Sequence, residues 1–585
     1  MKLSQNLNKY QLFSFLGLFL IGLDFWAVAL ALVNFFYWPL LVTYLLLGGL
    51  FLFFLFFRNA KALRSINLLF ITILALAFVL LLTFSFVPTV FSGRDQGSFS
   101  EAAVRLAQNH QLSFSSTAEQ AFFQIYGPGP ALNFPGFSYT PEGNLVTHFS
   151  LGYIAWLATF YSLFGLAGFA IANGLAFLLF LLAFSFLVEL HTSNKTAIMA
   201  ILMLISSFVF AWLFKFTLSE NLALAFIWFG LLELSLFFKF KKDYYFLLAL
   251  GAFFVLAFTR IEAWAFLLML ALLLVVARKK MMFPWEKALL RKTLWLSGGF
   301  FFIYLINVFV NNQFYLASLR GILRSFFSSQ NGFVFFSSST YLLKVFSLYN
   351  ILPFLLMGAI GLSYFLLKQK YQLLLVAFII SPTFLYLIHP GISRDHPWML
   401  RRFAFTIIPG AFFYALLVID RLFVKKLYFF SLLFILIGTN LLVSWPYFTF
   451  KENADLLAKT KTLSENFSAT DLVLVDRLAS GDAWSMLSAP MSFLYGKQAV
   501  YFFNPQDLAK INLSKFSHVY LIAPDTNLAF YQKEHFLDRF SAQKSYTIER
   551  TFLSTFNPKE TPNSPFGLPQ KREELVQGKI YLLNK

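Results

Sequence analysis

Long apolar runs recur along most of this chain, from Leu12 to Pro446, and they restrict what it can fold into. Many of these runs reach about 20 residues, which is the length that an α-helix needs to cross a bilayer. The chain has 585 residues, of which 59% are hydrophobic and 12% are charged. This composition is typical of a polytopic α-helical membrane protein.

The first apolar run, Leu12 to Val33, is expected to remain as a membrane anchor. It is too long for the core of a signal peptide, and no small-residue cleavage site follows it. The chain contains no cysteine. Disulfides, thiol catalysis and metal sites with cysteine ligands are therefore excluded.

The net charge of +19 lies mainly in the part of the chain before Pro446. There the lysines and arginines gather in short loops between apolar runs, as expected for the cytoplasmic side of a membrane protein. Nucleic acid is therefore not expected as a partner. The basic loops contain Lys2 and Lys9; Arg58, Lys61 and Arg64; Lys239, Lys241 and Lys242; Arg278 to Lys280 with Lys287, Arg291 and Lys292; Lys368 and Lys370; and Lys425 and Lys426.

Placing every basic loop on the cytoplasmic side predicts a topology of about thirteen crossings. The segment 148–165 is left out of this count, because a crossing there would move the basic loop at 239–243 outside. We expect it to form a helix in the outer interface. The N-terminus is then cytoplasmic, and the protein is expected in the plasma (inner) membrane. The expected spans cover about residues 11–33, 35–57, 66–88, 167–190, 196–214, 220–238, 243–258, 263–277, 293–311, 349–367, 371–388, 403–423 and 427–446.

The same topology gathers much of the scarce acidic charge on the outer side. Asp95 follows the third span within GRDQGSFSEAA, and an ionisable residue at that depth is a functional candidate. Carboxylates mixed with arginines can hold a base and bind a phosphate. The candidate site residues are Arg94, Asp95, Glu220, Arg260, Glu262, Arg394, Asp395, His396, Arg401 and Arg402.

These candidates also have purely structural interpretations. Asp95 and Glu220 can each cap the helix that follows them. Arg260 and Glu262 can form a simple ion pair. The basic residues from 394 to 402 can anchor headgroups of the outer leaflet.

The outer segment 89–166 is expected to have internal order. EAAVRLAQ repeats its apolar residues at helical spacing until Asn109 and His110 end the pattern, which predicts a short helix lying along the membrane. YGPGPALNFPGF and TPEGN then supply turns. A loop of this length between spans more often has a function than serves only as a connection.

The order of these features resembles the GT-C glycosyltransferases. That superfamily uses sugars linked to polyprenyl phosphate and includes the protein O-mannosyltransferases and the lipid A aminoarabinose transferases. Its first core helix runs outward and is followed by an acidic motif and two interfacial helices. Asp95, EAAVRLAQNH at 101–110 and the 148–165 helix ending in Phe164-Gly165 match this order.

Two later positions extend the resemblance over about residues 66–446. Glu220 in LSEN matches an acidic residue at the outer start of a helix, and Thr259-Arg260 in FTRIE matches a Thr-basic pair at an outer helix end. The superfamily pattern commonly reads Asp-Glu where this chain has Asp95-Gln96. A second adjacent carboxylate is therefore missing here.

The resemblance implies transfer of a sugar from a polyprenyl-phosphate carrier to an acceptor hydroxyl on the outer face, with inversion at the anomeric carbon. The reaction needs a base for the hydroxyl, for which Asp95 is the candidate, and cations for the departing phosphate. Arg260 and the basic residues of RDHPWMLRRF at 394–403 are the candidate cations. The acceptor is a glycan, a lipid or a protein, and membrane lipids are further partners. No cofactor is certain, and a divalent metal is left open.

Residues 447–585 are expected to form a separate soluble α/β domain on the extracytoplasmic side of the membrane. Short β-rich runs occur at 471–477, 499–503, 518–524 and 579–585, and helix-like stretches divide them. Asp476, Arg477 and Asp482 either face the site or belong to an ordinary polar loop. No phosphate-loop or Rossmann fingerprint is present, which disfavours a nucleotide-sugar donor.

Two other functional classes remain as alternatives. A transporter or flippase of lipid-linked sugars would have charged or Gly/Pro-broken residues near mid-membrane and an internal repeat, and neither is evident in the sequence. A non-catalytic cell-envelope assembly protein would not require acidic and basic residues at the outer ends of several spans.

Overall fold

The structure is a computed structural model. It describes all residues except 1, 60–65, 89, 92–93, 280–286, 312–314, 317–318, 321–333, 389, 391, 393–399, 424, 483, 485, 534, 556–566 and 585.

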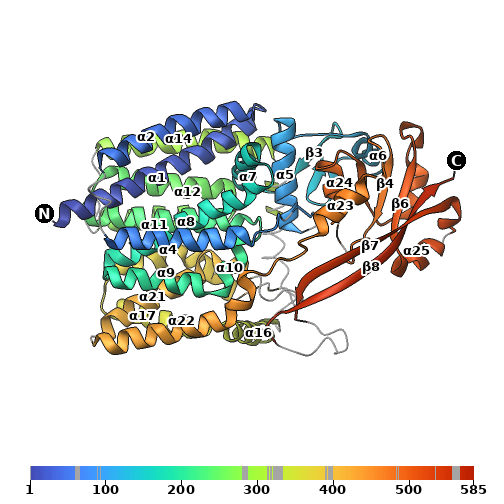
Figure 1. The fold of residues 1–585 in the computed structure, drawn as a ribbon. Helices are drawn as coiled ribbons and strands as arrows, with labels where there is room; N and C mark the ends of the chain where they lie inside the picture. The colour runs from blue at the N-terminus through green and yellow to red at the C-terminus, as the bar shows by residue number, and fades with distance from the viewer. Residues whose placement is uncertain are drawn as a thin grey trace.

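A bundle of helices forms most of the molecule (Figure 1). Its N-terminus lies at one end, called the distal end here, and the C-terminal domain covers the other, called the domain end. The bundle helices are α1 (Lys2–Leu32), α2 (Trp38–Arg58), α4 (Ile66–Phe84), α8 (Ala167–His191), α9 (Asn194–Ser206), α10 (Phe208–Phe214), α11 (Ser219–Phe240), α12 (Asp243–Thr259), α13 (Ala263–Lys279), α14 (Lys287–Val310), α17 (Leu352–Leu367), α18 (Tyr371–Ile380), α21 (Ile407–Leu422) and α22 (Lys426–Phe448).

The bundle has the surface of a membrane protein. Within the described residues, seven helices are long and apolar enough to cross a bilayer, or up to nine if each bent helix pair counts as one span. The outer helix α2 exposes Phe53, Phe54 and Phe57 at 62%, 69% and 74%. Large apolar side chains that face outward in such numbers are typical of a surface that lipid covers.

Helix α11 lies at the centre and is buried along its candidate span. Polar side chains near it are paired across helices: Lys9 with Glu189, and Ser14 with Glu233 at 2.7 Å. Asp24 differs, because it is fully buried and neither of its carboxylate oxygens has a hydrogen-bond partner within the described part of the chain.

The outer segment forms a compact layer at the domain end. Figure 1 shows α5 standing across the end of the bundle. Helix α5 ends where the sequence predicts, since His110 caps it with a φ of 61°, and α7 occupies the expected 148–165 region. Helix α6 and the three antiparallel strands, in the order β1-β2-β3, were not predicted. The elements are α5 (Asp95–Asn109), α6 (Thr117–Tyr126), β1 (Gly129–Pro130), β2 (Phe137–Tyr139), β3 (Leu145–Thr147) and α7 (Leu151–Phe164).

The C-terminal domain contains a five-stranded sheet in the order β5-β4-β6-β8-β7. Strand β4 is parallel to β5 and β6, whereas β8 is antiparallel to β6 and β7. The predicted runs correspond to β4, β5, β6 and the end of β8, but β7 was not predicted. The elements are α23 (Leu456–Ser464), β4 (Leu472–Asp476), α24 (Ser488–Phe493), β5 (Gln498–Phe502), β6 (Val519–Pro524), α25 (Leu528–Gln532), β7 (Phe540–Ser554) and β8 (Gln570–Leu583).

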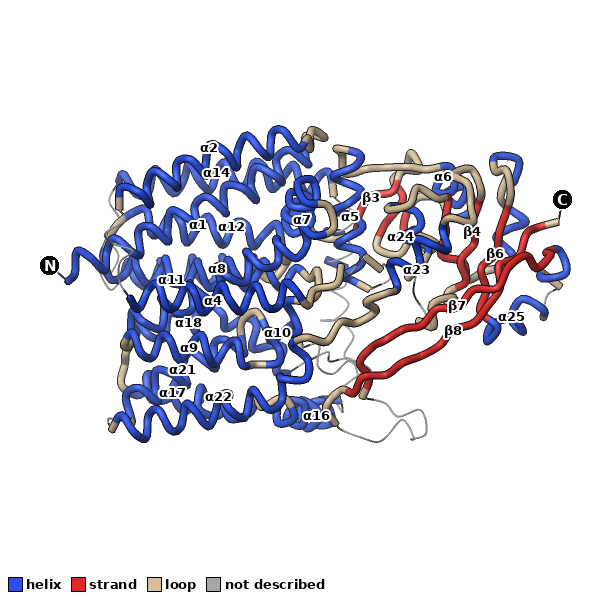
Figure 2. Tube along the Cα trace, in the orientation of Figure 1, coloured by secondary structure: helices blue, strands red, loops and turns tan. Residues whose placement is uncertain are grey.

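The domain is anchored at both of its sides. Figure 2 shows the long β7–β8 hairpin reaching back towards the end of α22, where the Tyr447 hydroxyl donates to the Pro569 carbonyl at 2.7 Å. On the other side, Arg105 of α5 donates to the Ser492 hydroxyl at 2.8 Å. Gln108 donates to the carbonyl of Phe493 at 2.9 Å. The domain therefore holds α5, the helix that begins at Asp95.

Candidate functional site

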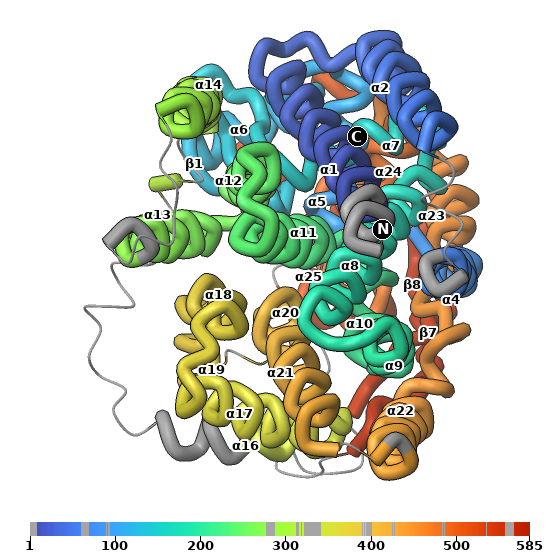
Figure 3. Tube along the Cα trace, turned by 90° about the vertical axis from the view of Figure 1, so that its left-hand side faces the viewer, coloured from blue at the N-terminus to red at the C-terminus, as the bar shows by residue number. Residues whose placement is uncertain are grey.

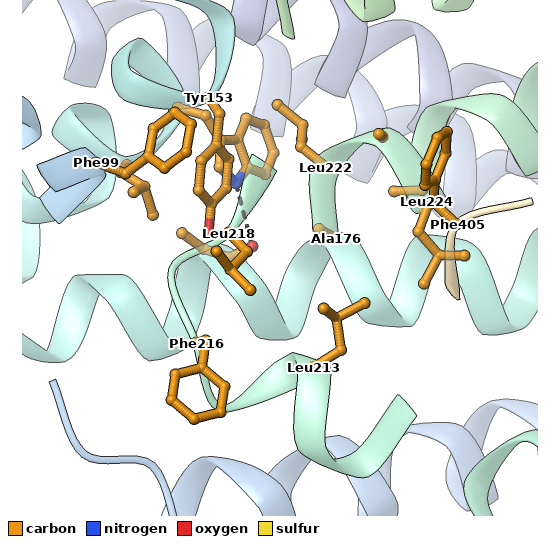
Figure 4. Close-up of a cluster of buried hydrophobic side chains, with 14 of the residues drawn as sticks. Phe99, Tyr153, Ala176, Leu213, Phe216, Leu218, Leu222, Leu224 and Phe405 are labelled. Carbon is orange, nitrogen blue, oxygen red and sulfur yellow. Dashed lines mark hydrogen bonds between the residues drawn. The ribbon is translucent and has the colours of Figure 1, made fainter. Parts of the chain in front are cut away.

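The loop between α10 and α11 brings Glu220 to the domain end of the bundle. The side-chain amide of Asn173 donates to the carbonyls of Phe214 and Phe216, at 3.0 Å and 2.9 Å. The Tyr153 hydroxyl donates to Asn173 at 2.7 Å. Figure 4 shows Tyr153, Phe216 and neighbouring apolar side chains packed around this loop. The start of α11 is thereby held rigidly, with Glu220 in its first turn.

The same loop is attached to the first turn of α5. Thr217 donates through its hydroxyl to the Gln96 carbonyl at 2.7 Å, and it shares a hydrogen bond of 2.7 Å with the Ser100 hydroxyl. Gln96 therefore contributes its backbone to this contact. The attachment sets the position of Asp95 relative to Glu220.

Arg260 follows the last residue of α12 and is held between two carboxylates. Its guanidinium lies 2.8 Å from Glu220 and 2.7 Å from Glu262, and it stacks on the Phe405 ring at 4.9 Å. Its side chain is 15% exposed. Arg260 thus has ion-pair partners on both sides within the protein.

Arg401 continues this arrangement towards solvent. Its Nη1 lies 2.5 Å from the Asp95 carboxylate, and its Nε lies 3.6 Å from Glu220. Asp95 and Arg401 are 39% and 33% exposed, whereas Glu220 is 3% exposed. The five residues form an ion-pair chain, which runs Asp95–Arg401–Glu220–Arg260–Glu262 and has its most buried member, Glu220, in the middle.

Tyr386 and Arg402 border the Glu262 end of the ion-pair chain. Tyr386, in α19 (Leu385–Ile388), donates to Glu262 at 2.5 Å. The Arg402 guanidinium lies 5.7 Å from the Tyr386 ring. Burial raises the pKa of Glu262, but Arg260 and the hydroxyl of Tyr386 outweigh it and lower the pKa to about 2. Glu262 is therefore ionised and serves as a fixed counter-charge.

Helix α7 packs tightly against the end of α12 that carries Arg260. The Ser150 hydroxyl donates to the Thr259 carbonyl. A Cβ at Gly152 would lie 2.8 Å from the Thr259 hydroxyl and 3.0 Å from the Phe258 carbonyl carbon. Only glycine at position 152 allows the backbone of α7 to approach the end of α12 this closely. The contact fixes the end of α12 against α7.

The C-terminal domain reaches the site through Asp482. Its carboxylate lies 3.8 Å from Arg94 and 3.6 Å from Arg550 of β7. Asp476 instead accepts hydrogen bonds from Tyr531 at 2.5 Å and from Asn527, inside its own domain. Asp482 therefore contacts the residue next to Asp95, whereas Asp476 has a structural role.

The structure brings together six of the ten predicted site residues: Asp95, Glu220, Arg260, Glu262 and Arg401 in the ion-pair chain, with Arg402 beside it. Arg94 lies near Asp482 instead. Arg394, Asp395 and His396 lie outside the described residues. Among the residues that are described, no group of three or more acidic or histidine side chains could hold a metal ion.

Sequence reasoning missed two neighbours of the site. Tyr386 lies in the apolar run of an expected span, where no sequence pattern marks it as a site residue. His148 lies near Asp95, where burial lowers its pKa and the Asp95 carboxylate offsets this only in part. Its position directly before the 151–164 helix was the only available hint.

No family model matches the chain, and no curated protein matches it.

Proposed function

We propose that this protein is a membrane glycosyltransferase of the GT-C type. It moves a sugar from a polyprenyl-phosphate carrier to an acceptor hydroxyl at the domain end of the bundle. The observation that carries the proposal is the Asp95–Arg401 pair, in which a partly exposed carboxylate meets a partly exposed guanidinium that buried Glu220 also contacts. The proposal assigns the carboxylate as the base and the adjacent guanidinium as the phosphate-binding cation.

The proposed orientation has thirteen crossings, a cytoplasmic distal end and an extracytoplasmic C-terminal domain. Short apolar helices such as Leu69–Phe84, Asp243–Thr259 and Ala263–Val276 support the count, because each can complete a span with its flanking turn. The basic loops around Lys241 and Lys370 support the orientation, since they follow the distal ends of α11 and α17.

In the proposed reaction, the acceptor oxygen attacks the anomeric carbon and the bond from that carbon to the phosphate oxygen breaks. Asp95 takes the hydroxyl proton, and the carrier phosphate leaves with the bonding electron pair. The phosphate gains one negative charge in this step. We assign Arg401 to bind that charge, because a guanidinium group binds phosphate oxygens in a bidentate manner.

In this proposal, the Asp95–Arg401 pair makes the donor bind before Asp95 can act as the base. Without substrate, its Nη1 is occupied by Asp95. A donor phosphate competes for the same guanidinium and frees the carboxylate to accept a hydrogen bond from the acceptor hydroxyl. Binding of the donor therefore prepares the base.

Arg260 acts as a positioning residue in this proposal. Its donors already face Glu220, Glu262 and the Ser219 hydroxyl, so little of the group is left for a ligand. Its charge keeps Glu220 in place under Arg401. This role differs from the phosphate contact that the sequence suggested.

The test is Asp95→Asn in the purified full-length protein. Asn keeps the shape of the side chain but cannot take up a proton, so single-turnover transfer from labelled polyprenyl-phosphate sugars to envelope extract should fall by about 100-fold or more. Binding of polyprenyl phosphate should survive. The control is Asp243→Asn, which makes the same change at the distal end, where Asp243 pairs with Lys292 at 3.0 Å.

Near-normal transfer by the Asp95 variant would remove it as the base. The transporter alternative predicts another outcome, in which the protein moves lipid-linked sugar across vesicles and no acceptor is modified. A lack of both activities would favour the non-catalytic alternative.

A further inference from the structure

A groove opens in the side of the bundle near the distal end. It has a volume of about 370 Å³, and its walls are almost entirely apolar. They include Phe238 of α11, Leu273 of α13, Leu362 and Leu366 of α17, and Leu375 of α18. Figure 3, which looks onto the distal end, shows α13 and α18 as neighbours, with α11 and α17 on either side. The groove lies in the part of the bundle that lipid surrounds.

A second, more polar cavity of about 120 Å³ adjoins the groove. The two cavities share Phe238, Gln372 and Leu375 as walls. The smaller one is also lined by His191, Ser235 and Lys239. Together the two adjoining cavities offer an apolar part along the helices and a polar part at their distal ends.

The charge around the polar part is positive. Lys239 donates to the Leu190 carbonyl at 3.2 Å, which holds its ammonium at the end of α8. Arg421 of α21 is close enough to act on His191 together with Lys239. The nearby carboxylate of Glu189 is engaged by Lys9. Asp420 accepts a hydrogen bond from Thr196 at 2.6 Å.

We propose that this combined cavity binds an anionic phospholipid of the leaflet at the distal end, which is cytoplasmic in the proposed orientation. The phosphate lies against Lys239, with the side-chain amide of Gln372 as a hydrogen-bond donor, and one acyl chain fills the groove. An apolar groove within a bilayer is filled by an acyl chain, because burying a polar group there is costly. The lysine selects anionic over zwitterionic headgroups.

This site is separate from the ion-pair chain. Gln372 lies near the start of α18, and Tyr386 lies after its end, so the two are about 20 Å apart at 1.5 Å per helical residue. Bound lipid would fill the space between α13 and α18, two helices whose domain ends lead to Glu262 and Tyr386 respectively. The site does not depend on the proposed transferase reaction.

The experiment is native mass spectrometry of the full-length protein in detergent, titrated with phosphatidylglycerol, phosphatidylethanolamine or polyprenyl phosphate. Lys239→Ala should weaken phosphatidylglycerol binding by about tenfold, because a charge-assisted contact is lost. Leu273→Trp should weaken it similarly by filling the groove, and Gln372→Ala provides a milder variant if the tryptophan disturbs folding. Lys368→Ala is the control, since it removes an exposed lysine of the same end that lines neither cavity.

Wild-type protein should prefer phosphatidylglycerol to phosphatidylethanolamine. Equal binding of the two lipids, or unchanged phosphatidylglycerol binding by Lys239→Ala, would overturn the proposal. If Leu273→Trp weakened only polyprenyl phosphate binding, the groove would belong to the tail of the sugar donor instead. A loss of sugar transfer alone would bear on Asp95 and would leave this lipid site unaffected.

Discussion

Arg401 and Asp95 form an ion pair of 2.5 Å although they lie far apart in the sequence, Asp95 at the start of α5 and Arg401 just before α21. The same guanidinium contacts buried Glu220 through its Nε. A ligand phosphate can thus displace the exposed partner of Arg401 while the buried partner keeps the side chain in place.

Replacing Arg401 should therefore affect the donor more than the fold. Arg401→Ala is expected to weaken polyprenyl phosphate binding by about 1.5–3 kcal/mol, the usual loss for a hydrogen bond to a charged group. Arg401→Lys should recover only part of this, because an ammonium cannot contact Asp95 and Glu220 in the geometry of a guanidinium. Competition binding measures the effect, with Arg539→Ala, at an exposed position of the C-terminal domain, as control. Unchanged affinity in the Arg401 variants would place the phosphate elsewhere.

Arg260→Ala should destabilise the protein. The change leaves buried Glu220 without its 2.8 Å partner and Glu262 without its 2.7 Å partner. Removing one member of a buried ion pair commonly costs about 3–5 kcal/mol. We expect a clearly lower thermal unfolding midpoint, and partial recovery when Glu262→Gln is added to remove one uncompensated charge. A variant with a normal midpoint but poor donor binding would instead support a direct phosphate contact by Arg260.

The stability of the domain junction should depend on pH through Glu452. Burial raises the pKa of this carboxyl to about 7, although Arg550 of β7 and Arg94 act in the opposite direction. Between about pH 4.5 and 7 the folded protein therefore binds more protons at Glu452 than the unfolded chain does, and this contribution to stability is lost as the pH rises.

Glu452→Gln removes that dependence. The unfolding midpoint of the variant, measured relative to wild type, should rise from pH 5 to pH 8. Because both proteins share every other titrating group, the difference isolates Glu452. A difference that stays constant across this range would show that Glu452 does not titrate there.

The orientation can be tested directly, since the chain contains no native cysteine. A single cysteine in place of Lys241 should react with a membrane-impermeant thiol reagent only from the cytoplasm. One in place of Thr462, which is exposed in the C-terminal domain, should react only from outside. Labelling of the Lys241 position from outside would reverse the proposed sidedness and place Asp95 on the cytoplasmic side.

The structure departs from the sequence predictions where contacts are non-local. Strand β7 has charged and polar residues at many of its positions, and it becomes a strand because it pairs with β8 along nearly its whole length. Strands β1 to β3 are only two or three residues long, and pairing with one another stabilises them. Neither case leaves a strong local pattern to detect.

The sequence by itself determined the class of this protein. The length of each apolar segment and the placement of lysine and arginine beside it are local properties, and they decide whether a segment inserts into a bilayer and in which direction. It also determined which ionisable residues lie near helix ends, among them Asp95, Glu220 and Arg260. Only the tertiary structure decided their partners. Ion pairs depend on distances of a few ångströms between helix ends, and those distances follow from the packing of α5, α11 and α12. The assignment of Arg260 to buried Glu220 and partly buried Glu262, and of Arg401 to exposed Asp95, therefore required the folded chain.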